Sequence, residues 1–225
     1  MIYTHHKCGT NYIGSIIHQM GVEHGVSIPW DSNACYRKIP HERKSQPGLH
    51  IIRDPRDIVL SSYHSHINDE DYNGIKGHPL TNWPELRAHR LKLQNVSLEE
   101  GLYMDMMFIE SPNWMTTILP YRKRVQPPMT QILTWDYDNT YIETLRMEDW
   151  VENTHEYMKR EYDEEHHDAL EKVITNNSFE SLQSSKPHHY RGRKKYKWKT
   201  ELPESIIDLC NLRYCRVIER FYSDV

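Results

Sequence analysis

Short apolar runs that end in charged turns and lead into helices constrain the fold of this chain most strongly. The first run opens the chain and is followed, after a turn containing Gly9, by apolar residues at helical spacing from Ile13 to Met20. The second run, Leu49–Ile52, stops at Arg53. Asp54 and Pro55 then suit the N-cap and the first position of a helix.

A third strand is predicted at 140–147, where β-branched and polar residues alternate. Strand–turn–helix units in series favour an α/β fold, specifically a three-layer sandwich around a central parallel sheet. Helices are predicted near 85–93, from Ser97 onward, at 150–162 and at 166–173, and a final helix is predicted from Leu202 to Phe221. The stretch from Val22 to Pro47 is predicted to be a loop.

The turn after the first strand has the composition of an anion site. Lys7, Gly9 and Thr10 lie between strand and helix, where backbone N–H groups and a helix N-terminus converge on one spot. The Walker loop differs, because its lysine follows the second glycine, whereas Lys7 precedes Gly9. An ordinary structural turn is the alternative. Ligands bind at the carboxyl edge of parallel sheets, and the turn at Arg53 is predicted to lie on the same edge.

Composition limits the function classes. The 225 residues, 37% hydrophobic and 27% charged, predict a single domain over 1–225 with a helical insertion around 66–125. The formal net charge of −4 argues against nucleic acid as a partner, and no apolar run reaches membrane-spanning length. The absence of a secretory signal and of a paired cysteine pattern favours reduced thiols and a cytoplasmic location. The 15 histidines lack a His-Glu-x-x-His spacing, so we interpret them as mostly surface residues and expect no metal.

The stretch from Arg53 to Tyr63 resembles the 3′-phosphate-binding motif of sulfotransferases that use 3′-phosphoadenosine-5′-phosphosulfate (PAPS). In that family an arginine ends a strand and a serine eight residues later lies in the following helix, as Arg53 and Ser61 do. Lys7-Cys8-Gly9-Thr10-Asn11-Tyr12 resembles the family's 5′-phosphosulfate loop. Three later stretches, at 145–150, 178–182 and 191–199, are similar to further family segments in the same order.

The resemblance implies a P-loop-NTPase-like sulfotransferase fold and a sulfuryl transfer from PAPS to a hydroxyl or amine acceptor, leaving PAP. It assigns Lys7 to neutralising the leaving oxygen and no metal to the reaction. It also implies a set of cofactor-binding residues: Lys7, Cys8, Gly9, Thr10, Asn11, Tyr12, Arg53, Ser61, Phe179, Arg191, Gly192 and Arg193. Whether Arg191 or Arg193 meets the 3′-phosphate stays open, because the glycine of this segment is displaced from the family pattern.

Three positions of the first loop depart from the family, namely Cys8, Asn11 and Tyr12. A cradle made of backbone N–H groups tolerates the first two changes, and Tyr12 keeps an aromatic face for the adenine. The first candidate for the general base is His41, which lies between the two cofactor motifs. Other candidates for this base are Glu42, Glu23 and His66.

The resemblance implies a single sulfotransferase domain in which the insertion around 66–125 binds the acceptor. A small molecule or a glycan is the expected acceptor, without further specification. Two other functions remain possible on the sequence. One is a non-catalytic nucleotide-binding protein that kept the fold, and the other is a P-loop-type kinase, which would need a Walker lysine and magnesium ligands that the sequence does not display.

Overall fold

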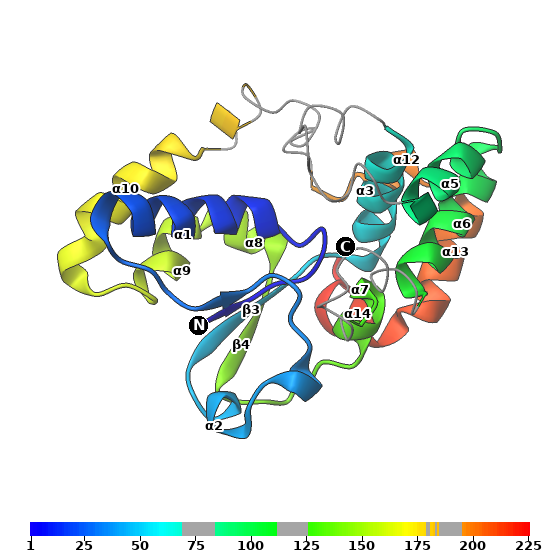
Figure 1. Ribbon diagram of the computed structural model, residues 1–225. Helices are drawn as coiled ribbons and strands as arrows, with labels where there is room; N and C mark the ends of the chain where they lie inside the picture. Colours follow the sequence, from blue (N-terminus) through cyan, green and yellow to red (C-terminus); the bar gives the residue numbers. More distant parts are fainter. Residues whose placement is uncertain (69–83, 112–125, 179–180, 183, 185–194) are drawn as a thin grey trace. The chain divides into compact units, whose positions relative to one another are not determined.

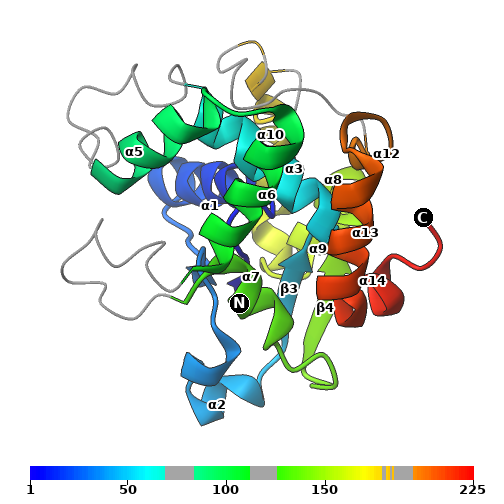
Figure 2. The same ribbon diagram turned by 90° about the vertical axis from the view of Figure 1, so that its right-hand side faces the viewer.

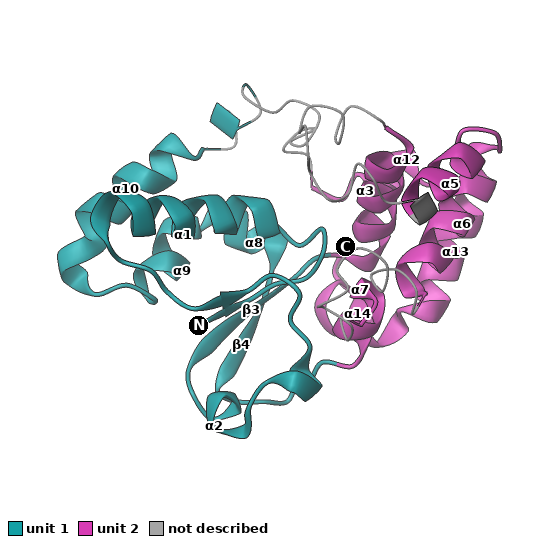
Figure 3. Cartoon of the chain, in the orientation of Figure 1, with its two compact units in different colours: residues 1–53, 135–193 teal, residues 54–134, 194–225 magenta. Residues whose placement is uncertain are grey.

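The computed structural model describes residues 1–68, 84–111, 126–178, 181–182, 184 and 195–225. The chain forms two compact units, coloured separately in Figure 3. Unit 1 comprises residues 1–53 and 135–193, and unit 2 comprises residues 54–134 and 194–225. The predicted single domain with an insertion around 66–125 stays a prediction. Within the described residues, no helix combines the length and the apolar character needed to cross a bilayer.

Unit 1 is built on a four-stranded parallel sheet in the order β2-β1-β3-β4. The strands are β1 (Ile2–Tyr3), β2 (Trp30–Asp31), β3 (Gly48–Ile52) and β4 (Ile142–Arg146). The predicted α/β class with a parallel sheet is therefore confirmed. Strand β2 was missed, because it lies inside the predicted loop and two residues are too few to show a period.

One face of this sheet is covered by α1 (Thr10–His24), α8 (Met147–Glu152), α9 (Thr154–Lys159) and α10 (His167–Asn176), as Figure 1 shows. Apolar side chains of α1 spaced three and four apart form one core with strand residues and with Trp150. The helix predicted at 150–162 is interrupted, because Asn153 donates its backbone N–H to the carbonyls of Asp149 and Trp150 and ends α8. Shorter helical segments in unit 1 are η1 (Tyr36–Lys38), α2 (His41–Lys44) and η4 (Glu164–His166).

The opposite face of the sheet carries a buried histidine pair. The Nε2 atoms of His5 and His50 lie 2.7 Å apart, and His50 Nδ1 lies 3.1 Å from Thr144 Oγ1. The His50 ring stacks on Trp135 at 3.7 Å between centroids. Burial, and secondarily the neighbouring His5, hold the pKa of His50 well below its ordinary value, so its ring stays neutral. The interpretation of the histidines as mostly surface residues is thus wrong for these two.

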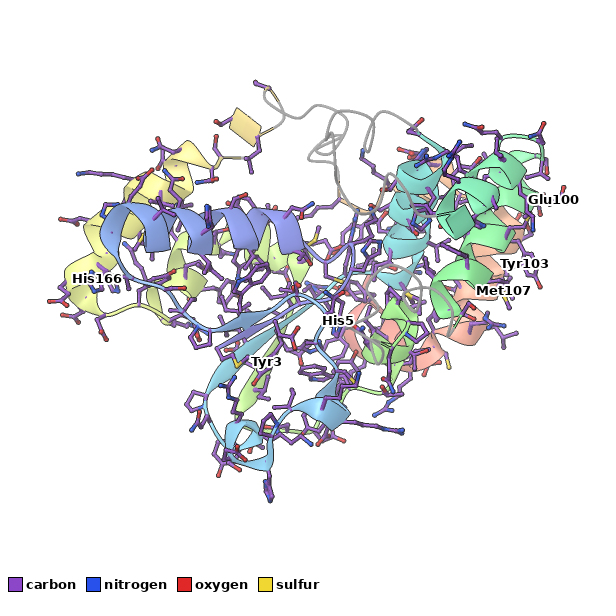
Figure 4. The ribbon with its side chains drawn as sticks, viewed as in Figure 1. Tyr3, His5, Glu100, Tyr103, Met107 and His166 are labelled. Atoms are coloured by element: carbon purple, nitrogen blue, oxygen red, sulfur yellow. The ribbon has the colours of Figure 1, made fainter. Side chains whose placement is uncertain are left out.

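Unit 2 is helical in its described part (Figures 1 and 2). Its helices are α3 (Pro55–Ile67), α5 (Pro84–Leu93), α6 (Leu98–Glu110), α7 (Pro128–Leu133), α12 (Trp198–Glu201), α13 (Glu204–Arg213) and α14 (Cys215–Phe221). The single helix predicted at the end of the chain breaks at Tyr214, which is buried and donates to Glu110. Tyr103 and Met107 lie on the exposed face of α6, as Figure 4 shows.

The start of α3 depends on one buried carboxylate. Asp54 caps the helix by accepting from Arg56 N at 2.9 Å, as predicted, and its two oxygens also accept from the Arg56 guanidinium at 2.9 and 2.7 Å. The side chains of Asp54 and Arg56 are 0% and 5% exposed. Arg56 lies over the Trp198 ring at 3.7 Å, so this ion pair also orders the contact between α3 and α12. Ser97 caps α6 in the same way but at the surface, by accepting from Glu100 N.

These two caps make a matched pair for a stability test. Ser97→Ala removes a cap only, and we expect it to lower the free energy of unfolding by about 1 kcal/mol. Asp54→Ala also leaves a buried guanidinium without its carboxylate, so we expect a loss of about 3–5 kcal/mol. Urea denaturation followed by circular dichroism measures both values. Equal losses in the two variants would show that the Asp54–Arg56 pair adds nothing beyond the cap.

Candidate functional site

The segment from His5 to Thr10, which we call the Lys7 turn, joins β1 to α1 in unit 1. Lys7 and Gly9 both have a positive φ, 65° and 74°. Glycine adopts this conformation without strain, whereas for lysine it is uncommon and costs energy. Gly9 is the N-cap of α1, and none of the described side chains caps the helix there. The first backbone N–H groups of a helix have no acceptor within the helix, so an uncapped N-terminus is suited to an anion.

Hydrogen bonds hold the turn in this shape. Cys8 N donates to His5 O at 3.0 Å, and Thr10 Oγ1 donates to the same carbonyl at 2.8 Å. Thr4 Oγ1 lies 3.2 Å from Thr10 Oγ1 and ties the turn to the end of β1. A Cβ on Gly9 would lie 3.4 Å from Met147 Sδ, so α8 packs closely behind the turn. The strained backbone of Lys7 is therefore supported on several sides.

Arg53 joins the turn from the end of β3. Its Nη1 donates to the backbone carbonyl of Lys7 at 3.4 Å. The structure thus brings together two residues that the sequence placed in separate motifs, and both are only partly buried. Two cationic side chains at one edge of a sheet, beside a helix N-terminus, can neutralise a ligand with more than one negative charge.

Cys8 lies behind the turn, fully buried. Burial raises the pKa of its thiol from the ordinary 9.0 to about 12, and the charges of Arg53 and Glu148 act on it in opposite directions. All four cysteines fall in the described part of the chain and none forms a disulfide. Cys8 therefore acts as a packed apolar residue. The contact with a ligand that is predicted for this position would come from its backbone and not from its thiol.

The other residues of the predicted loop lie on the first turn of α1. Asn11 is exposed, and Tyr12 is half-buried. The Tyr12 ring meets Trp150 edge to face at 5.5 Å, and its hydroxyl donates to Thr154 Oγ1 at 3.4 Å. The orientation of this ring is thus fixed by α8 and α9, which gives it a defined face for stacking.

The structure does not bring His41 to the Lys7 turn. His41 opens α2 and is exposed, and α2 contacts the segments that lead into the strands. Arg43 in α2 donates to Met1 Sδ, and the carbonyl of Lys44 accepts from Asn139, which precedes β4. His41 and its neighbour Glu42 are therefore at the amino edge of the sheet, opposite the carboxyl edge where Lys7 and Arg53 lie, as can be followed in Figure 1.

The remaining predicted residues are placed as follows. Glu23 is exposed near the end of α1, far along the helix from the turn. His66 is buried in unit 2, where its Nδ1 lies 2.6 Å from Asp105 Oδ1. Ser61 is half-buried on α3, also in unit 2. Phe179, Arg191, Gly192 and Arg193 lie outside the described residues, so their predicted contacts stay predictions.

Sequence reasoning missed one polar residue at the carboxyl edge. Asp31 ends β2, directly beside β1, and its carbonyl accepts from Thr4 N at 2.8 Å. Its carboxylate accepts from Asn33 N at 2.9 Å and is half-buried. Recognising Trp30–Asp31 as a strand would have placed Asp31 next to the Lys7 turn. The proline before Trp30 and the polar residues after Asp31 gave a loop signal instead.

Comparison with known proteins supports the fold. No protein-family model and no curated protein matches the sequence. Among solved structures, the chain is similar to the crystal structure of mouse sulfotransferase SULT7A1 complexed with PAP, with a TM-score of 0.54 and 13% sequence identity. The match covers 99% of this chain and 84% of that one. The chain therefore has an α/β fold like that of a sulfotransferase.

The environment of Cys8 leads to a reactivity test. A pKa of about 12 in place of 9.0 lowers the thiolate fraction at pH 8 roughly a thousandfold, so we expect iodoacetamide to leave Cys8 unmodified in the native protein. Cys215 is exposed and should be alkylated first. Peptide mass spectrometry after timed quenching measures both rates, with urea-unfolded protein as the control for intrinsic reactivity. Alkylation of Cys8 at the rate of Cys215 would contradict the closed packing behind the turn.

Proposed function

We propose that this chain is a sulfotransferase that moves a sulfuryl group from PAPS to a hydroxyl or amine acceptor. The observation that carries the proposal is the strained, uncapped Lys7 turn with Arg53 hydrogen-bonded to its backbone. Strained backbone that the surroundings hold in place is concentrated at binding and catalytic sites. The fold likeness to a sulfotransferase crystallised with PAP supports the same function.

The residues of the turn suit the 5′ end of such a nucleotide. When bound, PAPS supplies a sulfuryl group on a phosphate leaving group. Lys7 provides a positive charge for the leaving oxygen, and the backbone N–H groups of Gly9, Thr10 and Asn11 provide donors. Gly9 has no side chain, which leaves room for close approach, and it adopts its positive φ without strain.

Arg53 is suited to the 3′-phosphate. Its guanidinium can donate two parallel hydrogen bonds to phosphate oxygens, which a lysine cannot do. Its bond to the Lys7 carbonyl links the two ends of the proposed nucleotide site through one side chain. Ser61, Phe179 and the Arg191–Arg193 segment keep the cofactor roles that the resemblance implies, as proposals. A small molecule or a glycan remains the proposed acceptor, and a cytoplasmic location is proposed with it.

The sharpest test of this proposal compares two nucleotides. Wild-type protein should bind PAP more tightly than adenosine 5′-monophosphate, which lacks the 3′-phosphate. Arg53→Ala should weaken PAP binding by about ten- to a hundredfold, the value of a charge-assisted hydrogen bond, and change the binding of the monophosphate little. Isothermal titration calorimetry measures all four affinities. Equal weakening of both nucleotides would mean that Arg53 only supports the turn, and no binding of PAP by the wild type would refute the proposal.

Two glycines provide a control for backbone strain in the same experiment. Gly9 and Gly25 both have a positive φ, 74° and 70°, at opposite ends of α1. Gly9→Ala and Gly25→Ala should therefore lower stability by similar amounts, about 1–2 kcal/mol. Only Gly9→Ala should weaken the binding of both nucleotides, because Gly25 is at the far end of the helix from the turn.

His41, the first candidate for the general base, lies away from the Lys7 turn. Because His41 is at the amino edge, we propose that Asp31 accepts the proton of the acceptor. Asp31→Asn keeps the hydrogen bond to Asn33 N and should lower the transfer rate by about 10²–10⁴-fold. His41→Ala should leave the rate unchanged. Single-turnover transfer from PAPS to a panel of phenols, amines and sugars measures both variants.

The same panel addresses the alternative of a non-catalytic nucleotide-binding protein. That alternative gains support from the position of His41, since the predicted base is not brought to the nucleotide edge. PAP binding without transfer to any acceptor would favour it. Transfer by the wild type that His41→Ala abolishes and Asp31→Asn leaves intact would reverse our assignment of the base.

A further inference from the structure

Three helices of unit 2 bring a second group of polar side chains together in a buried position. His66 on α3, His89 on α5 and Asp105 on α6 each offer one atom of a kind that binds metals, and these atoms lie within 4.8 Å of one another. Asp105 Oδ1 is 2.6 Å from His66 Nδ1 and 2.8 Å from His89 Nε2. The side chains are 2%, 8% and 0% exposed in this order. The group belongs to unit 2, whereas the Lys7 turn belongs to unit 1.

Asp105 provides the buried carboxylate of this group. Both imidazoles approach the same oxygen, Oδ1. The second oxygen, Oδ2, is buried and has no hydrogen-bond partner in the described part of the protein. A buried carboxylate oxygen without a partner is costly, so a ligand for it is expected.

Neighbouring groups hold the two rings in fixed orientations. The His89 ring stacks on Phe108 at 4.0 Å between centroids, with 14° between the planes. The Arg90 guanidinium donates to the backbone carbonyl of His66 at 2.9 Å, and Ser62 Oγ lies 3.3 Å from His66 Nδ1. The Phe108 contact therefore fixes the plane of the His89 ring, and the Arg90 bond fixes the backbone that carries His66.

We propose that His66, His89 and Asp105 bind a divalent transition-metal ion of the zinc type. Two imidazoles and one carboxylate match the protein ligands of several zinc sites, which keep a fourth position for water or another oxygen. Ser62 Oγ is near enough to contribute to that position. Tetrahedral ligands at about 2.0–2.1 Å from the ion are roughly 3.3 Å apart. Binding therefore requires each imidazole nitrogen to move away from Asp105 Oδ1, from 2.6 and 2.8 Å, by roughly half an ångström or slightly more.

The proton balance of this step is simple. In the hydrogen-bonded form, each imidazole donates to Asp105 Oδ1 from the nitrogen that faces it. On binding, each facing nitrogen gives up its proton to the other ring nitrogen or to solvent, and its lone pair goes to the ion. The ion replaces the two N–H donors on the carboxylate. The sequence did not predict this site, because its three residues come from separate helices and match no spacing motif.

Cobalt binding to the 225-residue chain tests this proposal. After treatment with a chelator and desalting, titration with Co²⁺ should reach saturation at one ion per chain, with the visible absorption of a low-symmetry, four-coordinate ion. Zn²⁺ should displace it and raise the melting temperature. His66→Gln and His89→Gln should each weaken binding at least tenfold, because each keeps a donor for Asp105 but loses the imidazole ligand.

His64→Gln is the matched control, since His64 lies on the same helix two residues away, is half-exposed and pairs with Glu201. This variant should bind cobalt as the wild type does. Near-ultraviolet circular dichroism confirms that each variant is folded. Asp105→Asn, which retains an oxygen acceptor, tests whether the carboxylate itself is needed for cobalt binding. The proposal is overturned if the wild type binds no cobalt stoichiometrically, or if His66→Gln, His89→Gln and Asp105→Asn bind it as tightly as His64→Gln does.

Discussion

The backbone pairing of β1 determines where the candidate residues of unit 1 lie. This strand has only two residues, yet it is hydrogen-bonded to β2 on one side and to β3 on the other. Because all three strands are parallel, the residues that follow them reach the same edge of the sheet. Lys7, Asp31 and Arg53 come from three distant parts of the sequence and are brought to one edge by this pairing alone. The core formed by α1 against the sheet supports the pairing.

The same pairing explains how an unfavourable backbone conformation persists at Lys7. A positive φ at a lysine costs of order 1 kcal/mol or more. The surrounding bonds offset it, since Thr10 and Cys8 both donate to His5 O and Arg53 donates to Lys7 O. Two of these bonds lie within the turn and the third comes from the end of β3, so local contacts and the finished fold support the turn together.

Much of the fold could be predicted from local signals, because those signals act over a few residues. The cap at Asp54, the strands at 48–52 and 142–146 and the apolar face of α1 all follow from short-range patterns. The two-residue strand β2 could not be predicted, because its extended shape comes from pairing with β1 and not from its own composition. The breaks at Asn153 and Tyr214 were missed for a related reason, since the helical period continues across both.

The residues of the candidate sites also differ in whether local sequence could predict them. Lys7 and Arg53 were found in the sequence because a turn after a strand is a local feature. His41 was chosen by its position between two motifs, and only the sheet topology reveals that this position faces the amino edge. The burial of His66 and His89 could not be predicted, because the residues around them in the sequence do not distinguish them from exposed histidines. Both histidines are buried by the packing of α3, α5 and α6, and both contact the carboxylate of Asp105. A polar group can remain in such a core only if its partners arrive from other helices, so buried polar sites of this kind are properties of tertiary structure and not of any one segment.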